Sequence, residues 1–188
     1  MKEYKLQEIR IEDYEKLNTY YQMRRPESSD SNLLDLYLWM NCYPTWYFTN
    51  DKGLMWVAKS DNGQYYSSVP CCRNEDLKEC FLETQKYFNE ILHKKLVMYV
   101  VDAAAMEHLD LSEDEYVVIP DRTYADYVYD AEKLRTFSGK KYHNKKNHLN
   151  AFKREYEGRY RFEFLSNKNE DEIMQFLEFW KRHKKHTE

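Results

Sequence analysis

The sequence predicts an α+β protein in which a mixed sheet is flanked by helices. Two turn signals, "NDKG" and "DNG", separate three short segments rich in aromatic residues, a pattern typical of an antiparallel meander. Stretches before and after the meander carry apolar residues at helical spacing. The 188 residues include 42% hydrophobic residues, four glycines and four prolines, which indicates a globular chain long enough to bury a core.

Two helices are expected before the meander. A short strand at 3–9 precedes the first helix, at 11–23, whose apolar positions follow roughly helical spacing. Asp30 or Ser31 is placed to cap a second helix at 32–41. This second helix is apolar nearly all round, so we expect it to be buried.

The central part of the chain is predicted to hold the sheet. A helix capped by Asn74 is expected at 74–93, with its apolar residues on one stripe. The continuous apolar run at 96–101 is typical of a central strand, and we expect it to join the meander in one sheet. The three strands of the meander are placed at 45–50, 54–60 and 64–70.

A short helix at about 103–109 and a strand at 116–120 complete a first region, residues 1–137. The predicted order is β-α-α-β-β-β-α-β-α-β, an antiparallel start followed by a helix-flanked central strand. This order is typical of the acyl-CoA N-acyltransferase (GNAT-like) fold. We therefore predict a first GNAT-like domain at 1–137.

Residues 138–188 are predicted to form a basic connecting helix, then a strand at 159–165 and a helix at 169–186. We interpret the last two elements as the opening strand and helix of a second, truncated GNAT-like domain. The last helix has more apolar side chains than one side can hide, so we expect an exposed apolar face and self-association through it. These side chains are Ile173, Met174, Phe176, Leu177, Phe179 and Trp180.

The segment "SGKKYHNKKNHLNAFKREY", at 138–156, is basic, although the whole chain has a net charge of −4. Gly139 can end the short helical run before it. Leu149, Phe152 and Tyr156 have the spacing of one apolar helix stripe, with Lys145 at its edge. No helix breaker follows Gly139 within the segment, so a helix is expected.

Acidic residues that would relieve the lysines at i,i+4 are missing from this segment until Glu155. Such a surface suits phosphate, from a lipid headgroup, a tRNA backbone or a nucleotide. The alternative is a solvated helix face whose lysines serve solubility. The candidate anionic-ligand residues are Lys140, Lys141, His143, Lys145, Lys146, Asn147 and His148.

Several other classes of site are not indicated. The four cysteines form no CxxC pair, so we interpret them as reduced thiols of a cytosolic protein, and no His/Cys spacing predicts a metal site. The sequence has no P-loop, no GxGxxG and no GxSxG motif. No apolar run approaches membrane-span length, and the charged N-terminus does not resemble a signal peptide. We expect no cofactor.

An acetyl-CoA-dependent GNAT protein usually carries an Arg/Gln-x-x-Gly-x-Gly/Ala loop where its fourth strand enters the next helix. Here that place reads "SVPCCRNEDLKE", which contains no glycine. Backbone amides would then not be arranged to hold a pyrophosphate in the usual way. This argues against an acyl-CoA N-acyltransferase, which remains an alternative.

Two segments carry a resemblance to a known family: "SDSNLLDLYLWMNCYPTWYFTNDKGLMWVAKSDNGQYYSSVP" and "DYVYDAEKLRTFSGKKYHNKKNHLNAFKREY". They resemble bacterial proteins related to the C-terminal domain of phosphatidylglycerol lysyltransferase, a family long described as of unknown function. The resemblance covers essentially the whole chain, although family members are usually longer. It implies two GNAT-like domains in tandem, similar to the peptidyltransferases that build cell-wall cross-bridges.

The resemblance also implies a function, because characterised relatives move an aminoacyl group from aminoacyl-tRNA to phosphatidylglycerol. The expected partners are therefore aminoacyl-tRNA and an anionic lipid or amine acceptor. We expect the protein in the cytoplasm or peripheral to the inner membrane surface. A non-catalytic module that binds an anionic lipid or RNA is the second alternative, since most of a second domain is missing.

Overall fold

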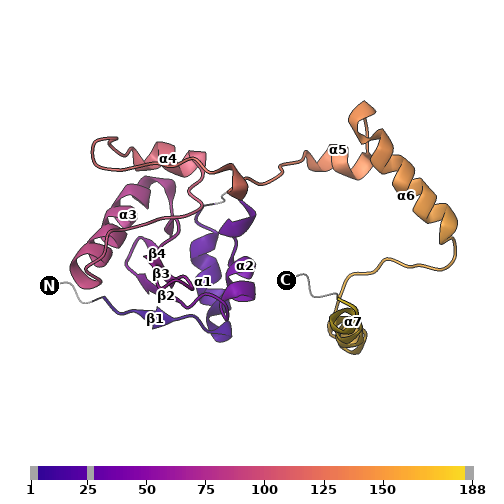
Figure 1. Cartoon of the computed structure of the whole chain (residues 1–188), viewed down its shortest axis with the longest axis horizontal. Coiled ribbons are helices and arrows are strands. Elements are labelled where there is room, and N and C mark those ends of the chain that lie inside the picture. Colours follow the sequence, from indigo (N-terminus) through magenta and orange to yellow (C-terminus); the bar gives the residue numbers. More distant parts are fainter. Residues whose placement is uncertain (1–3, 25–27, 185–188) are drawn as a thin grey trace. The chain divides into compact units, whose positions relative to one another are not determined.

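The computed structural model describes residues 4–24 and 28–184 (Figure 1). The chain is divided into two compact units, Met1–Tyr127 and Val128–Glu188. We call them unit 1 and unit 2 and describe each by itself. The predicted domain boundary after residue 137 stays a prediction.

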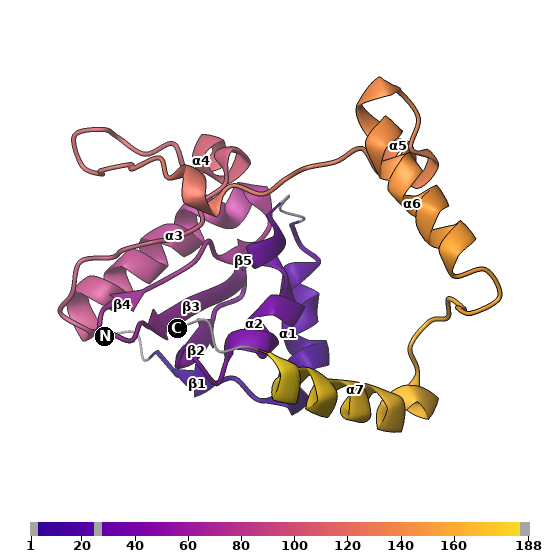
Figure 2. The same ribbon diagram turned by 45° about the vertical axis from the view of Figure 1, so that its right-hand side comes forward.

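Unit 1 is built on a five-stranded sheet, which confirms the predicted α+β class (Figure 2). All its strand pairs are antiparallel, in the order β1-β2-β3-β4, and β5 also pairs with β3. The predicted meander is confirmed, although its third strand has two residues. The strands are β1 Gln7–Glu8, β2 Thr45–Thr49, β3 Gly53–Lys59, β4 Tyr65–Tyr66 and β5 Cys71–Cys72.

Alternation along β2 and β3 gives the sheet two apolar faces. Tyr47 pairs with Trp56, and both belong to a core cluster with Leu17 and Leu33 of the first two helices. Phe48 pairs with Met55, and both belong to the cluster on the opposite face. Because successive side chains of a strand point to opposite faces, this short stretch supports packing on both sides.

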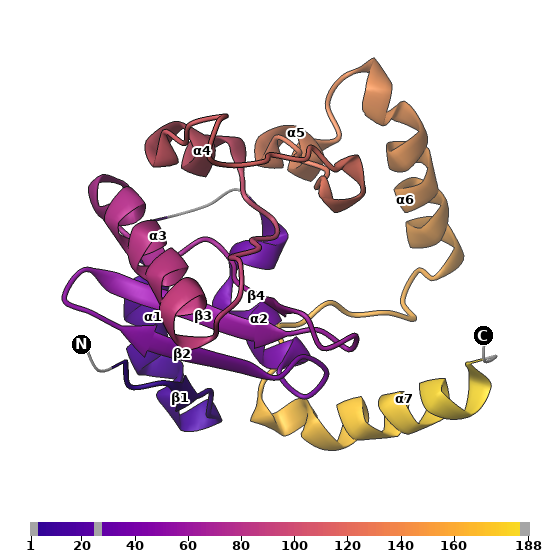
Figure 3. The ribbon, with the colours of Figure 1, turned by 60° about the vertical axis from the view of Figure 1, so that its left-hand side comes forward.

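Helices cover both faces of this sheet. Helix α1 (Tyr14–Tyr21) and helix α2 (Leu33–Trp39) pack on the Trp56 side. Helix α3 (Leu77–Lys86) and helix α4 (Ala103–Leu109) pack on the other, and Figure 3 shows α3 and α1 on opposite sides of the strands. The helices predicted in these regions are confirmed.

The predicted helix at 74–93 is divided. A 3-10 turn (Asn74–Asp76) leads into α3, and a π-helical turn (Tyr87–Ile91) follows it. The prediction that Asn74 caps this helix is wrong. Asn74 begins the 3-10 turn, and no side chain makes a capping hydrogen bond at the start of either element.

The second helix differs from its prediction in cap and burial. Asn32 caps α2, because its side-chain oxygen accepts a hydrogen bond from the Asp35 backbone N–H at 2.9 Å. Asp30 and Ser31 lie in the 3-10 turn before it. Only Leu33 of α2 is buried, whereas Leu38 is 69% exposed. The expectation of a buried helix was wrong because the sheet covers one side of it.

The strand predicted at 96–101 does not form. Its contact with the sheet is one parallel bridge, in which the Ser67 N–H donates to Val97 O at 2.9 Å and the Tyr99 N–H donates to Ser67 O at 3.1 Å. Val100 then adopts a left-handed φ of 54°, which ends the extended run. The segment therefore lies beside the sheet without adding a strand to it.

The strand predicted at 116–120 is also wrong. This segment has no regular structure in the described chain, and Val117 is 89% exposed. An apolar, β-branched run favours a strand only where another strand offers backbone partners. The segment pairs with no strand here.

Unit 2 consists of helices and connecting segments in its described part. Gly139 has a φ of 93° and precedes the 3-10 turn Lys140–Tyr142, so it opens the basic helix. Phe137, at φ 47°, follows the preceding helix in the left-handed position predicted for Gly139. The helices are α5 Ala131–Thr136, α6 His143–Glu155 and α7 Glu170–His183.

Two predictions for unit 2 have opposite outcomes. The strand at 159–165 is absent, and Phe164 is 89% exposed, because no strand in the described part of this unit pairs with it. Helix α7 forms after a capping box between Ser166 and Asn169. Its apolar face is exposed as predicted, including Met174 and Phe179.

Within residues 4–24 and 28–184, no helix has both the length and the apolar character needed to cross a lipid bilayer.

Candidate functional site

The seven predicted anionic-ligand residues lie at the start of the basic helix of unit 2. Lys140 and Lys141 are in the 3-10 turn, and the other five are in α6. All seven are exposed, while Tyr142 between them is buried. The helix predicted from the absence of breakers therefore presents these side chains to solvent.

Helical spacing separates the seven residues onto different sides of α6. His143, Lys146 and Asn147 are at i, i+3 and i+4, so they share one side. Lys145 is in line with the apolar stripe, and His148 is on a third side. The side that holds His143, Lys146 and Asn147 continues along the helix with Asn150, Lys153 and Arg154. We call these six residues the cationic face.

Sequence reasoning left Asn150, Lys153 and Arg154 out of the candidate site. The signal was available in the i, i+3, i+7 spacing that identified the apolar stripe, had it been applied to the cations as well. Lys153 and Arg154 also line a shallow depression of about 620 Å³ with Gly158 and Arg161. The cationic face therefore extends over most of the length of α6.

The cations of this helix have no carboxylate partners within the described chain. No ion pair among residues 4–24 and 28–184 includes a Lys or Arg from 140 to 154. The Asp130 carboxylate is held by Lys133, whose backbone N–H and ammonium group lower its pKa, and Lys141 adds a weaker attraction. The positive charge of α6 is thus not neutralised by ion pairing within this described part.

The N-terminus of α6 reinforces this charge. No side chain caps it, and no acidic residue lies in its first turn. The His143 N–H donates to the Lys140 carbonyl of the preceding 3-10 turn, but the helix dipole still favours an anion at this end. Lysines placed here oppose the dipole, so a phosphate bound to them would be stabilised by side chains and helix together.

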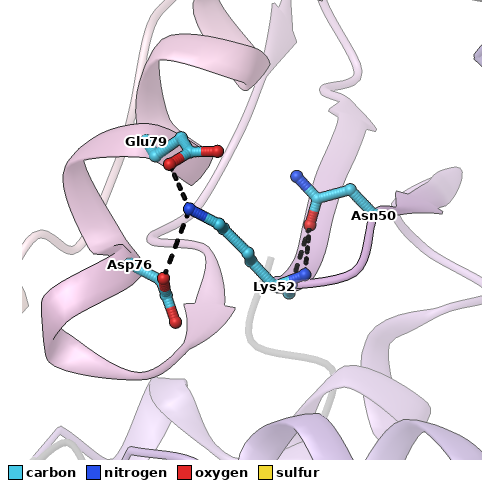
Figure 4. Close-up of polar contacts among 5 residues, drawn as sticks. Asn50, Lys52, Asp76 and Glu79 are labelled. Atoms are coloured by element: carbon cyan, nitrogen blue, oxygen red, sulfur yellow. Dashed lines mark hydrogen bonds and ion pairs between the residues drawn. The ribbon is translucent and has the colours of Figure 1, made fainter.

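The N-terminus of α3 has the opposite character. Glu75, Asp76 and Glu79 lie in its first turns. Lys52, from the β2–β3 turn, is paired with Asp76 at 3.7 Å and with Glu79 (Figure 4). The turn is fixed by Asn50, whose side-chain oxygen accepts from the Lys52 and Gly53 backbone N–H groups at 2.9 and 2.8 Å (Figure 4). Carboxylates here disfavour a bound pyrophosphate.

The glycine-free segment before α3 also forms a strand. Cys71 and Cys72 are in β5 and pair with Leu54 and Gly53 of β3. Gly53 is required by this close approach, because a Cβ there would lie 2.6 Å from the Cys72 Cβ. These residues therefore do not form an open loop of free amides.

All four cysteines are free thiols, as predicted. Cys72 and Cys80 are fully buried, and a hydrogen bond between their side chains raises the pKa of Cys72 and lowers that of Cys80. Among the described residues, no three His, Cys, Asp or Glu side chains gather as ligands for a metal ion.

Comparison with known proteins identifies the family. The family described as "Phosphatidylglycerol lysyltransferase, C-terminal" matches residues 21–188. The chain belongs to this family. Membership confirms the resemblance seen in the sequence.

One solved structure has the same fold. A conserved protein of unknown function from Bacteroides thetaiotaomicron VPI-5482 superposes with a TM-score of 0.82 at 23% sequence identity. The similarity covers 96% of this chain and 60% of that protein, so the chain spans less than two thirds of its relative's length. No curated protein matches the chain.

Proposed function

We propose that the chain is an aminoacyltransferase-related domain whose basic helix binds the phosphates of aminoacyl-tRNA or of an anionic lipid. The cationic face of α6 is the observation that carries this proposal. It lacks ion pairs within the described chain, and it extends from an uncapped helix N-terminus. Membership in the lysyltransferase C-terminal family supports the same class of reaction.

The chemistry that such a transfer needs is modest. An aminoacyl ester is already activated, so the protein must bind two phosphate-bearing partners, align an acceptor hydroxyl or amine, and stabilise an oxyanion. A row of lysines serves the first task, since each phosphate contact releases counterions and adds affinity. The acceptor proposed from family membership is a lipid headgroup, which would place the protein at the inner membrane surface.

We also propose that unit 1 is a GNAT-like domain and that the elements after α6 belong to a second one. Support comes from the antiparallel meander β2-β3-β4 followed by α3, and from the exposed apolar residues of 159–165 and α7, which suit a further domain. The predicted division into 1–137 and 138–188 is part of this proposal.

An acyl-CoA N-acyltransferase is the weaker candidate. The N-terminus of α3, where the usual pyrophosphate loop would end, carries three carboxylates. The preceding residues are paired in β5 instead of forming a loop. Both features disfavour an anionic cofactor at that position.

The test separates the candidates by substrate. The purified chain is incubated with lysyl-tRNA and phosphatidylglycerol vesicles, and in parallel with acetyl-CoA and amines. The proposal expects lysyl-phosphatidylglycerol to form and acetyl-CoA to remain unused. Acetyl transfer would favour the acyl-CoA candidate, and tRNA or lipid binding without turnover would favour a non-catalytic module.

Binding is tested with a matched pair of triple variants. One replaces Lys146, Lys153 and Arg154 with Gln, and the control replaces Lys86, Lys94 and Lys95 of unit 1, which are also exposed. Both remove three positive charges, so general electrostatics change equally. We expect a clear loss of tRNA and vesicle binding in the first variant alone; equal losses in both would contradict a site on α6.

A further inference from the structure

Unit 1 contains a cavity of about 680 Å³ that is separate from the basic helix. It opens on the side of the sheet covered by α1 and α2, and its wall continues over β3 and β4 to Tyr99 and Tyr124. Its size is in the range of pockets for small organic ligands. The proposed transfer to lipid does not use it.

The wall of this cavity is unusually aromatic. Three ring pairs line it, with centroid separations of 6.1, 6.1 and 5.3 Å. Tyr20 and Tyr124 add two further rings. Aromatic faces carry negative potential and attract cations. The three pairs are Tyr21–Trp56, Trp39–Tyr43 and Tyr66–Tyr99.

None of these rings is engaged by a cation of the protein within residues 4–24 and 28–184. The cation–ring contacts of the described chain involve Tyr47, Tyr65, Tyr142, Tyr156 and Trp180, which lie outside the cavity. No lysine of this described part lines the cavity either. The faces of its wall are therefore not engaged by cations of the described chain.

The ionic groups of the lining favour a cation. Arg24 is the one described cation in the wall, and its Nη1 is paired with Asp102 Oδ2 at 3.3 Å, with the Arg24 side chain 11% exposed. Asp30 and Asp35 also line the cavity, and neither carboxylate has an ion-pair partner among the described residues. With Arg24 balanced by Asp102, these two carboxylates give the described part of the lining a negative charge.

The Asp35 carboxylate is close enough to Asp30 to affect the pKa of Asp30. Partial burial raises the pKa of Asp30, and the carboxylates of Asp35 and Asp126 raise it further. Burial is the main cause that raises the pKa of Tyr21 in the aromatic wall, Cys71 raises it further, and Asp35 adds a smaller contribution. A bound cation would relieve this repulsion, which a neutral or anionic ligand would not do.

From this geometry we infer that the cavity is a binding site for a small organic cation with an alkylated ammonium head group, held by the aromatic pairs and by Asp30 and Asp35. Rings favour alkylated ammonium ions because these are weakly hydrated and spread their charge over an apolar surface. The mixture of aromatic wall and acidic edge distinguishes this site from an apolar pocket. The inference does not depend on the cationic face of α6.

The probe is choline, compared with dimethylbutanol, its uncharged carbon isostere, by calorimetry on the full chain. The two molecules have the same shape, so their difference measures the effect of the charge. We expect choline to bind at least tenfold more tightly than dimethylbutanol. Equal binding of the two, or no binding of choline, would overturn the inference.

Two substitutions test whether choline binds in this cavity. Asp35→Asn keeps the size of the side chain and removes its charge, and Tyr66→Leu removes one ring of a pair; we expect each to weaken choline binding several-fold. Asp51→Asn, in the exposed β2–β3 turn outside the cavity, is the matched control and should leave binding unchanged. Equal losses for Asp35→Asn and Asp51→Asn would overturn the inference. Circular dichroism checks folding, and the isosteric Asp35 variant keeps the test valid if Tyr66→Leu unfolds.

Discussion

Unit 1 and unit 2 contain similar aromatic sequence patterns, but these patterns form different structures in the two units. In unit 1, the aromatic segments of the meander find partners, and Tyr47, Phe48 and Trp56 are buried on the two faces of one sheet. In unit 2, the segment 159–165 has the same alternation and remains exposed. Tyr142 is the one buried hydrophobic residue in the described part of unit 2. A helix makes its backbone hydrogen bonds within its own segment, whereas a strand needs a neighbouring strand to make them.

The largest expected effect separates a core ring from an exposed one. Phe88 is fully buried in unit 1, whereas Phe152 of α6 is 44% exposed and stacks on Tyr156 at 4.9 Å. Phe88→Ala should cost about 3–5 kcal/mol of unfolding free energy, because it leaves a cavity. Phe152→Ala should cost about 1 kcal/mol or less. Urea unfolding measures both, and similar losses would break the distinction between the two units.

A smaller effect is expected where β3 meets β5. Gly53→Ala places a methyl group within 2.6 Å of the Cys72 Cβ and 2.9 Å of the Cys71 carbonyl oxygen. The strands must separate slightly, so we expect a cost of about 1–3 kcal/mol in the same urea experiment. Unchanged stability would show that the sheet of unit 1 is less tightly packed than its buried side chains indicate.

The exposed face of α7 predicts self-association. Leu177 and Trp180 lie on this face among other exposed apolar side chains. Replacing both with Gln should shift the chain toward the monomer, as measured by sedimentation equilibrium, because less apolar surface is hidden on association. The matched control replaces the exposed Leu34 and Leu38 of α2. A wild-type chain that stays monomeric at all concentrations would contradict the prediction.

The smallest effects concern two aspartates with opposite pKa shifts. The Ser29 backbone N–H and hydroxyl donate to Asp126 at 2.6 and 2.9 Å and lower its pKa, so the folded state favours its charged form. Its contribution to stability is present above the ordinary pKa of 3.8 and is lost as the pH falls through the lowered value. Asp126→Asn should therefore lower the free energy of unfolding at neutral pH. It should also make this free energy depend less on pH in the acid range.

Asp30 should behave in the opposite way. Its pKa is raised in the folded state, so the folded chain holds the proton more tightly than the unfolded chain. Stability therefore falls as the pH rises from 3.8 through the raised value, and Asp30→Asn should stabilise the protein at neutral pH. Thermal melts across this range test both variants. If both substitutions shifted the melting temperature at neutral pH in the same direction, the opposite pKa shifts of Asp126 and Asp30 would be contradicted.

Much of the fold could be predicted from sequence where the signal is local. The turns "NDKG" and "DNG" indicated the meander, and helical periodicity indicated α1, α3, α6 and α7. Strands 96–101, 116–120 and 159–165 were overpredicted because an apolar run, or an alternation of polar and aromatic residues, does not reveal whether a partner strand exists. The burial of α2 was misjudged for a related reason, since one sheet covers one side of a helix.

The candidate sites also could be predicted only where the pattern is local in the sequence. The basic residues 140–148 could be found by counting charges, and the cationic face could have been found from their helical spacing. The aromatic cavity could not, because it combines α1, α2, β3, β4 and residues near Tyr99, which only tertiary structure brings together. Sequence showed that tyrosine was abundant without showing that several tyrosines line one cavity.

The most direct test of the central claim is the salt dependence of tRNA binding by the full chain. If the cationic face contacts phosphates, replacing Lys146, Lys153 and Arg154 with Gln should flatten the slope of log K against log salt by roughly 2–3, since each lost contact removes about 0.7–0.9. The control triple at Lys86, Lys94 and Lys95 should keep the wild-type slope. An unchanged slope in the α6 triple variant would contradict the account and leave this helix as a solvated surface.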